Sequence, residues 1–294
     1  MLVAGAAAAA EPLVDSAWLK ARLGTPGLVV LDVTSNPAVF ARGHIPGAVY
    51  THYGKDGWRV DGKKNGRKVA GVLPPIPRLE QLIGGLGIGN DDHVVIVANG
   101  FSAAEMGTAT RIYWTFKVLG HDPVSILNGG MVAWRADKAN PLEANVTKPA
   151  PKTFTAAFRP ELIATTEDVR LALANGTALI DSRPADQYLG LNKSGSVSAY
   201  GTLPRAVSVP GAYMTVNGGG EIRDAGAMRQ LYAMSQAPTD GEAITFCNTG
   251  HWASLGWFVN SEILGNKNTA MYDGSMADWT TEDDAPVERK VKLD

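Results

Sequence analysis

The chain contains two copies of one pattern, and this internal repeat constrains its fold more than any other feature. Asp32 lies near the end of an apolar run in the first half, and Asp181 lies at the same place in a similar run 149 residues later. Trp134 corresponds in the same way to Trp279, 145 residues later. An offset that stays this similar over much of the chain indicates a duplication. The sequence therefore predicts two related domains, which is also the number expected for 294 residues.

Short apolar runs rich in β-branched residues alternate with helical patterns in both halves. Such runs are typical of parallel strands that are buried on both faces. The expected strands are residues 28–33, 94–98, 124–127, 178–183 and 243–246. The expected helices are residues 13–23, beginning at Asp15 or Ser16 as N-cap, then 77–86, 103–119 and a stretch after residue 250, whereas residues 56–67 are expected to form a loop.

This alternation predicts an α/β fold with two tandem domains, each a mainly parallel sheet flanked by helices. We place the first domain at residues 11–142 and the second at residues 161–294. Between them, residues 143–160 are rich in Pro, Lys, Thr and Ala and are interpreted as the linker.

Composition narrows the classes of function. The 45% hydrophobic and 19% charged residues fit a packed globular protein, and a net charge of −2 gives no basic field for nucleic acid. A single cysteine excludes an internal disulfide and a CxxC zinc site. The five histidines are scattered, so no metal cofactor is predicted, and no run reaches the roughly 20 apolar residues of a membrane span.

The N-terminal ten residues are small and apolar, and polar sequence begins at Glu11. Ala8 and Ala10 satisfy the small-x-small rule for signal-peptide cleavage before Glu11. No basic segment precedes them and the run is short. The segment is therefore either the end of a signal peptide that starts upstream or a frayed Ala-rich end. We expect a periplasmic or secreted protein, with a cytoplasmic location as the alternative.

Cys247 is the only cysteine in the chain, and it stands between an expected strand and an expected helix. Backbone N–H groups converge at such a turn and favour a thiolate, which is the nucleophilic form of cysteine. Ala98 begins the equivalent segment of the first half, so the first domain is expected to be catalytically inert and to serve as a structural partner. The alternative is a buried structural cysteine without a chemical role.

Three motifs, in this order and within a tandem repeat, resemble the two-domain rhodanese family of thiosulfate and 3-mercaptopyruvate sulfurtransferases. They are Gly43-His44-Ile45-Pro46-Gly47-Ala48, Asp181-Ser182-Arg183 and Cys247-x-x-Gly250. The resemblance covers the chain from about residue 12 to 285. It implies that Cys247 takes the outer sulfur of a small anionic donor as a persulfide and passes it to a thiophilic acceptor such as cyanide or a thiol. It implies no cofactor.

The resemblance also implies a binding site around Cys247. The loop Asn248-Thr249-Gly250-His251-Trp252 would cradle the sulfur with backbone N–H groups, and Gly250 would allow the chain to curl. His251 is either a protonated anion contact or an outward-pointing side chain, and Trp252 is expected to form the pocket wall.

Two arginines are candidate anion contacts. Arg183 would hold the donor through its bidentate fork, the alternative being a surface ion pair with Asp186. Arg205 stands where the family usually has a glycine, and it is either a second anion contact or exposed. Asp181 is expected to be a buried structural hydrogen-bonding residue. Thr202 replaces the motif histidine in the second copy, without a functional interpretation.

The donor is the most open question. The loop after Cys247 contains no Lys or Arg, which argues against thiosulfate, whereas an exported location argues against 3-mercaptopyruvate. Thiosulfate is our prediction and 3-mercaptopyruvate the alternative. A phosphatase of related fold would need Cys-x5-Arg, but Ala253 occupies that position. A non-catalytic sulfur-carrying or partner-binding module is the remaining alternative, and we expect a monomer.

Overall fold

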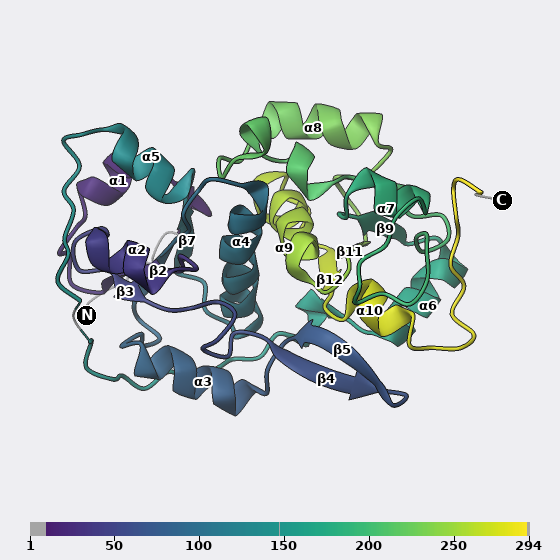
Figure 1. The fold of residues 1–294 in the computed structure, drawn as a ribbon, viewed down its shortest axis with the longest axis horizontal. Coiled ribbons are helices and arrows are strands. Elements are labelled where there is room, and N and C mark those ends of the chain that lie inside the picture. Colours follow the sequence, from purple (N-terminus) through teal and green to yellow (C-terminus); the bar gives the residue numbers. More distant parts are fainter. Residues whose placement is uncertain (1–9, 147, 293–294) are drawn as a thin grey trace, which may run out of the picture.

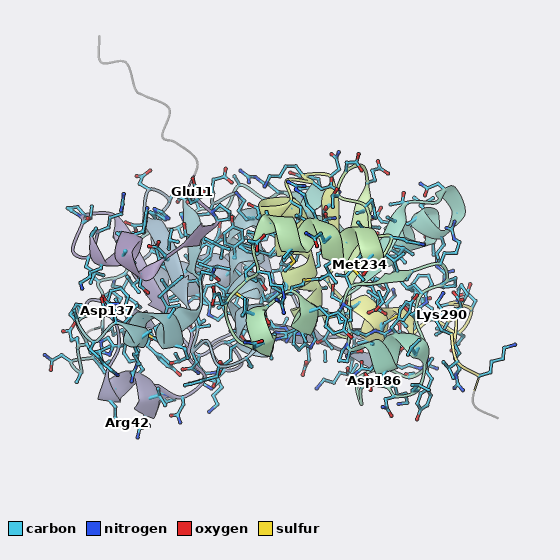
Figure 2. All side chains as sticks on the ribbon, turned by 90° about the horizontal axis from the view of Figure 1, so that it is seen from above. Glu11, Arg42, Asp137, Asp186, Met234 and Lys290 are labelled. Carbon is cyan, nitrogen blue, oxygen red and sulfur yellow. The ribbon has the colours of Figure 1, made fainter. Side chains whose placement is uncertain are left out.

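The structure is a computed structural model, and it describes residues 10–146 and 148–292. The predicted cleavage segment therefore lies largely outside the described residues. The two halves of the chain lie side by side (Figure 1), and in the view from above Arg42 and Asp137 mark one end of the molecule while Asp186 and Lys290 mark the other (Figure 2). Among the described helices, none is long and apolar enough to cross a membrane.

Each half forms one five-stranded parallel sheet. The first sheet has the order β1-β7-β6-β2-β3 and the second β8-β12-β11-β9-β10, so corresponding strands occupy corresponding places. The strands of the first sheet are β1 (Leu13–Val14), β2 (Leu28–Asp32), β3 (Val49–Tyr50), β6 (His93–Val97) and β7 (Val124–Leu127). Those of the second are β8 (Ile163–Ala164), β9 (Ala178–Asp181), β10 (Val207–Ser208), β11 (Ala243–Phe246) and β12 (Thr269–Tyr272). The shared order confirms the predicted fold class and its duplication.

Helices cover both faces of each sheet. The helices of the first half are α1 (Ser16–Lys20), α2 (Pro37–Arg42), α3 (Ile76–Gly85), α4 (Ala103–Val118) and α5 (Gly130–Ala136). Those of the second half are α6 (Thr166–Asn175), α7 (Ala185–Leu189), α8 (Ala225–Met234), α9 (His251–Trp257) and α10 (Ser275–Trp279). A π-helical turn, Phe258–Ile263, continues α9. The described residues between 144 and 159, inside the predicted linker, form no helix or strand.

The two halves share one hydrophobic core. Residues of α3 and α4 pack in a single cluster with residues of α8, α9 and both sheets, from Ile96 on β6 to Met271 on β12. The outer helices bury separate clusters, α1, α2 and α5 against the first sheet and α6 and α10 against the second. Helices α4 and α9 lie side by side at the centre of the molecule (Figure 1). The first half is therefore packed directly against the helix that follows Cys247.

Two expectations about local structure are wrong. Leu13 and Val14 form strand β1 beside β7 rather than a helical turn, and the helix begins at Ser16 after Asp15, whose carboxylate accepts the Trp18 N–H at 2.7 Å. The expected loop at residues 56–67 overlaps an antiparallel hairpin, β4 (Val60–Lys64) and β5 (Arg67–Val72). Asn65 and Gly66 make its turn, with φ of 51° and 74°. Asn-Gly is the strongest short hairpin signal, but the loop was predicted from the polar composition of the segment, which is not typical of strands.

The hairpin reaches from the first half across to the second, where it lies near α10 (Figure 1). Lys64 pairs with Asp278 at 3.1 Å and with Glu282 at 2.9 Å, and Arg67 pairs with Asp283 at 3.0 Å. These charges hold the hairpin beside the edge of the second sheet at which Cys247 lies.

Candidate active site

Cys247 lies at the carboxyl end of β11, the central strand of the second sheet. The register pairs Phe246 with Asp181 on β9, so Cys247 is the first residue beyond this pairing. Its side chain is 1% exposed and forms no disulfide. Sites in open parallel sheets form beyond the carboxyl ends of the strands. The only thiol of the chain is therefore placed where this fold builds its sites.

Residues 247–252, which are the tight turn after β11 and the first two residues of α9, are here called the Cys247 loop. Two of its carbonyl groups face α10, since Met276 N–H donates to the Cys247 carbonyl at 3.0 Å and Ala277 N–H to the Asn248 carbonyl at 2.9 Å. Four backbone N–H groups of the loop have no acceptor within the described chain, those of Asn248, Thr249, His251 and Trp252. Successive unpaired N–H groups form a concave anion site. The loop can therefore stabilise a negatively charged sulfur.

Ser275, the first residue of α10, supports the Cys247 loop through its side chain, and this role is not predicted from the sequence. Its Oγ accepts the N–H of Cys247 at 3.0 Å and that of Gly250 at 3.2 Å, and it lies 3.9 Å from Cys247 Sγ. The same hydroxyl donates to the Tyr272 carbonyl at 2.8 Å. Ser275 has a φ of 52°, as the equivalent Gly130 has 58°. The sequence does contain a signal for this role, because the second copy has Ser275 where the first copy has Gly130.

Arg111 on α4 ties the first half to the same loop. Its guanidinium is fully buried, donates from Nη1 to the Gly250 carbonyl at 3.2 Å and lies 2.5 Å from Asp273 Oδ1 at the end of β12. The Leu73 N–H donates to the other oxygen of Asp273 at 2.7 Å. Gly250 has a φ of 74°, and a Cβ there would collide with the Arg111 guanidinium, so only glycine fits.

His251 points to the first half, and neither predicted role fits it. Its Nε2 lies 2.9 Å from the Ala104 carbonyl and therefore carries the proton, so Nδ1 accepts the Tyr53 hydroxyl at 3.1 Å. Burial and then the charge of Arg59 lower the pKa of His251 to about 4. The ring is neutral at pH 7 and packed against α4. It is neither a cation for the donor nor an outward-pointing side chain.

The structure gives Arg183 a buried ion pair rather than a contact with the Cys247 loop. Its guanidinium is fully buried and donates to both carboxylate oxygens of Asp181, at 2.6 to 3.1 Å, and to the Gly201 carbonyl at 2.8 Å. Thr202 also donates to Asp181, at 2.7 Å, which confirms Asp181 as a structural hydrogen-bonding residue. Neighbouring strand residues point to opposite faces. Phe246, opposite Asp181, packs in the outer core, whereas Cys247 packs in the core shared by both halves.

Arg205 also lies away from the loop. Its Nη2 donates to the Ala172 carbonyl at 3.1 Å and to the Leu173 carbonyl, near the C-terminus of α6, and its backbone N–H donates to Glu288 at 3.1 Å. A guanidinium at a helix C-terminus is stabilised by the last carbonyl groups. These contacts favour a structural role for Arg205 at the end of α6.

The remaining loop residues do lie together around Cys247. Trp252 is half-buried against Gly211, where any Cβ would collide with its ring, and so forms a wall. The Asn248 side-chain amide donates to Gln187 Oε1 at 2.8 Å. The Thr249 carbonyl accepts a hydrogen bond from Arg59, a residue that precedes β4 in the first half. Tyr53, Arg59 and Arg111 were all missed, because nothing in the sequence links them to a loop about 140 to 200 residues away.

Within residues 10–146 and 148–292, no group of three His, Cys, Asp or Glu side chains is placed to hold a metal ion. Cys247 itself is a thiol beside N–H donors that have no acceptor among the described residues. Such a group forms and stabilises a covalent intermediate without further atoms.

Comparison with known proteins identifies the family. The model of the rhodanese-like domain matches residues 15–137 and 165–282. The thiosulfate sulfurtransferase of Corynebacterium glutamicum is 28% identical over 95% of this chain and 90% of its own length. The crystal structure of SseA from Escherichia coli, described with the catalytic mechanism of 3-mercaptopyruvate sulfotransferases, has a TM-score of 0.77 and 26% identity over 90% of this chain and 98% of its own.

A more distant structure shares the fold alone. The anaerobic ergothioneine biosynthesis enzyme of Chlorobium limicola has a TM-score of 0.79 and 19% identity, over 96% of this chain and 71% of its own. Both halves match the family model, both build the same sheet, and the second half carries the cysteine at its carboxyl edge. The chain therefore belongs to the rhodanese-like family, in its two-domain form.

Proposed function

We propose that the protein is a sulfurtransferase that moves a sulfane sulfur from thiosulfate to a thiophilic acceptor through a persulfide on Cys247. One observation carries the proposal: the only cysteine of the chain begins a loop with four backbone N–H groups that have no acceptor within the described residues. The name of the C. glutamicum relative, which aligns over nearly the whole chain, supports it.

The reaction consists of two displacements at sulfur. The Cys247 thiolate attacks the outer sulfur of thiosulfate, a new S–S bond forms, and sulfite leaves with the electron pair of the old one. The acceptor, for example cyanide, then attacks the outer sulfur of the persulfide. Thiocyanate forms and the Cys247 thiolate returns. Both states of the cysteine are anionic, and the N–H groups of the loop stabilise them without reorganisation.

3-Mercaptopyruvate is the second candidate donor, favoured by the likeness to E. coli SseA. The same thiolate would attack the donor thiol sulfur, and the carbon–sulfur bond would break. Pyruvate would leave with that electron pair and with the proton of the donor thiol. Parallel rate measurements with both donors at equal concentration decide between them: a higher kcat/KM with 3-mercaptopyruvate replaces thiosulfate as the assigned donor.

The test of the function is direct because the chain has one cysteine. Incubation with thiosulfate should add one sulfur atom to the wild type and none to Cys247→Ser, and cyanide should remove it again as thiocyanate. A wild type that takes up no sulfur from either donor contradicts the proposal and leaves the non-catalytic module as the function.

We further propose that the protein acts as an exported monomer. The small residues before Glu11 support export, through cleavage after Ala10. N-terminal sequencing of protein from a periplasmic fraction should begin at Glu11, and sedimentation should give the mass of one chain. An uncleaved protein confined to the cytoplasm contradicts the first part, and a dimer contradicts the second.

A further inference from the structure

The proposed donors are anions, yet no described Lys or Arg side chain of the catalytic half hydrogen-bonds to the Cys247 loop. The Cys247 loop contains no Lys or Arg, and Arg183 is enclosed by Asp181 and Gly201. Within the described residues, only two cationic side chains hydrogen-bond to the loop, Arg59 and Arg111, and both come from the first half. The anion contact must therefore be sought across the domain interface.

Of these two arginines, Arg111 already has partners within the protein. It is fully buried, lies 2.5 Å from Asp273 Oδ1 and donates to the Gly250 carbonyl. A guanidinium whose charge is neutralised by a buried carboxylate does not attract a second anion strongly. Arg111 positions the loop and leaves the donor to another residue.

Arg59, unlike Arg111, has no carboxylate partner among the described residues. The Arg59 side chain is half-buried. Asp61, the acidic residue of the adjoining hairpin, pairs instead with Lys68 at 2.7 Å. Arg59 donates from Nε to the Gly71 carbonyl at 2.8 Å and from Nη2 to the Thr249 carbonyl. Its Nη1 donates to no described residue and is not buried. A cation without an ion-pair partner among the described residues, beside N–H groups that have no acceptor there, indicates an anionic ligand.

Gly71 and Tyr53 hold the Arg59 guanidinium in place. Gly71 on β5 has a φ of 75°, and a Cβ there would collide with Arg59 Nη2. Any other residue at position 71 would displace the guanidinium from the Thr249 carbonyl. Tyr53 lies under it, with its ring centre 5.6 Å from Arg59 Cζ, and the Tyr53 hydroxyl is bonded to His251. The position of Arg59 is therefore set by three contacts and is not that of a mobile surface side chain.

We propose that Arg59, supplied by the non-catalytic half, is the donor-binding residue that holds the anionic end of the sulfur donor beside Cys247. The inference rests on the sulfurtransferase function proposed above. A sulfonate, as in thiosulfate, and a carboxylate, as in 3-mercaptopyruvate, both accept two hydrogen bonds from a guanidinium edge. The first half thus contributes to donor recognition although it has lost its own nucleophile.

Binding is measured apart from turnover, on a Cys247→Ser background that cannot react. Thiosulfate is titrated by calorimetry into Cys247→Ser alone and into the double variants with Arg59→Met, Arg59→Lys and Lys63→Met. Lys63 lies on the same hairpin, where its backbone pairs with Lys68, and its exposed side chain makes no hydrogen bond or ion pair with a described residue, so it controls for loss of one charge. Circular dichroism and the melting temperature establish that each variant is folded.

We expect Arg59→Met to raise the dissociation constant for thiosulfate at least about tenfold, Arg59→Lys to raise it less, and Lys63→Met to leave it unchanged. With the thiol restored, the Arg59 variants should raise KM by the same factor and change kcat less. Equal dissociation constants with and without Arg59, or no binding to Cys247→Ser, overturn the inference. Should Arg59→Met fail to fold, the Arg59→Lys comparison decides in the same way. If the wild type binds thiosulfate through Arg59 but forms no persulfide, the proposed function fails and the anion subsite stands.

Discussion

Replacing Ser275 removes one oxygen atom from beneath the Cys247 loop, and the cost can be worked out from its contacts. In Ser275→Ala, the buried N–H groups of Cys247 and Gly250 lose their acceptor. Each unsatisfied N–H costs roughly 1–3 kcal/mol, so the free energy of unfolding should fall by about 2–6 kcal/mol. Natural domains have about 5–15 kcal/mol in total, so the variant should still fold.

Ser275→Gly separates the hydrogen bonds from the backbone conformation. Residue 275 has a φ of 52°, which costs an L-residue about 1 kcal/mol and glycine almost nothing. The glycine variant should therefore be more stable than the alanine variant by about 1 kcal/mol, while both lose the same hydrogen bonds with Cys247, Gly250 and Tyr272. Because both variants release the loop, sulfur transfer should fall by about 100-fold in each.

The assay is urea denaturation followed by tryptophan fluorescence, together with the rate of thiocyanate formation. A Ser275→Ala protein as stable and as active as the wild type would refute the argument that this hydroxyl positions the loop. A glycine variant less stable than the alanine variant would refute the argument from φ.

Two other predictions concern Arg183 and His251. Arg183→Met should lower the free energy of unfolding by about 3–5 kcal/mol, because it leaves Asp181 buried without its partner, and it should leave the KM for thiosulfate near that of the wild type; a raised KM in a fully stable variant would return Arg183 to the site. His251 should make stability depend on pH, because its pKa is about 4 in the folded protein and near 6.5 when unfolded. Between these values the unfolded state binds more protons, so stability is present above pH 6.5 and is lost as the pH falls towards 4. The melting temperature of His251→Gln should fall less over this range than that of the wild type, and identical pH profiles would contradict the buried, neutral assignment.

The features that the sequence predicted well are those that depend on neighbours along the chain. The strand at residues 124–127 and the strand before Cys247 have the predicted bounds, because a short β-branched run and the turn after it specify both. The internal repeat predicted two related domains with mainly parallel sheets, and the two sheets have the same strand order because equal patterns fold in equal ways. These properties were sufficient to identify Cys247 and its loop as the candidate site.

The contacts that the sequence did not predict depend on residues that are distant along the chain or on the direction of a side chain. Arg183 was placed in the site by its motif, but its neighbours in space are Asp181, Gly201 and Thr202 on the face of the sheet away from the shared core. Which face a side chain takes at the end of a strand depends on the register, and a motif does not contain it. The sequence does not predict a role for Arg59, because its hydrogen bond to the Thr249 carbonyl forms only when the two halves pack together.

The most direct test of the whole account is the mass of the intact protein after incubation with thiosulfate. The account predicts a gain of one sulfur atom, located at Cys247 by peptide mapping, absent in Cys247→Ser and reversed by cyanide with one thiocyanate released. An unchanged mass after incubation with thiosulfate and with 3-mercaptopyruvate, in a protein whose thiol remains free, would contradict it.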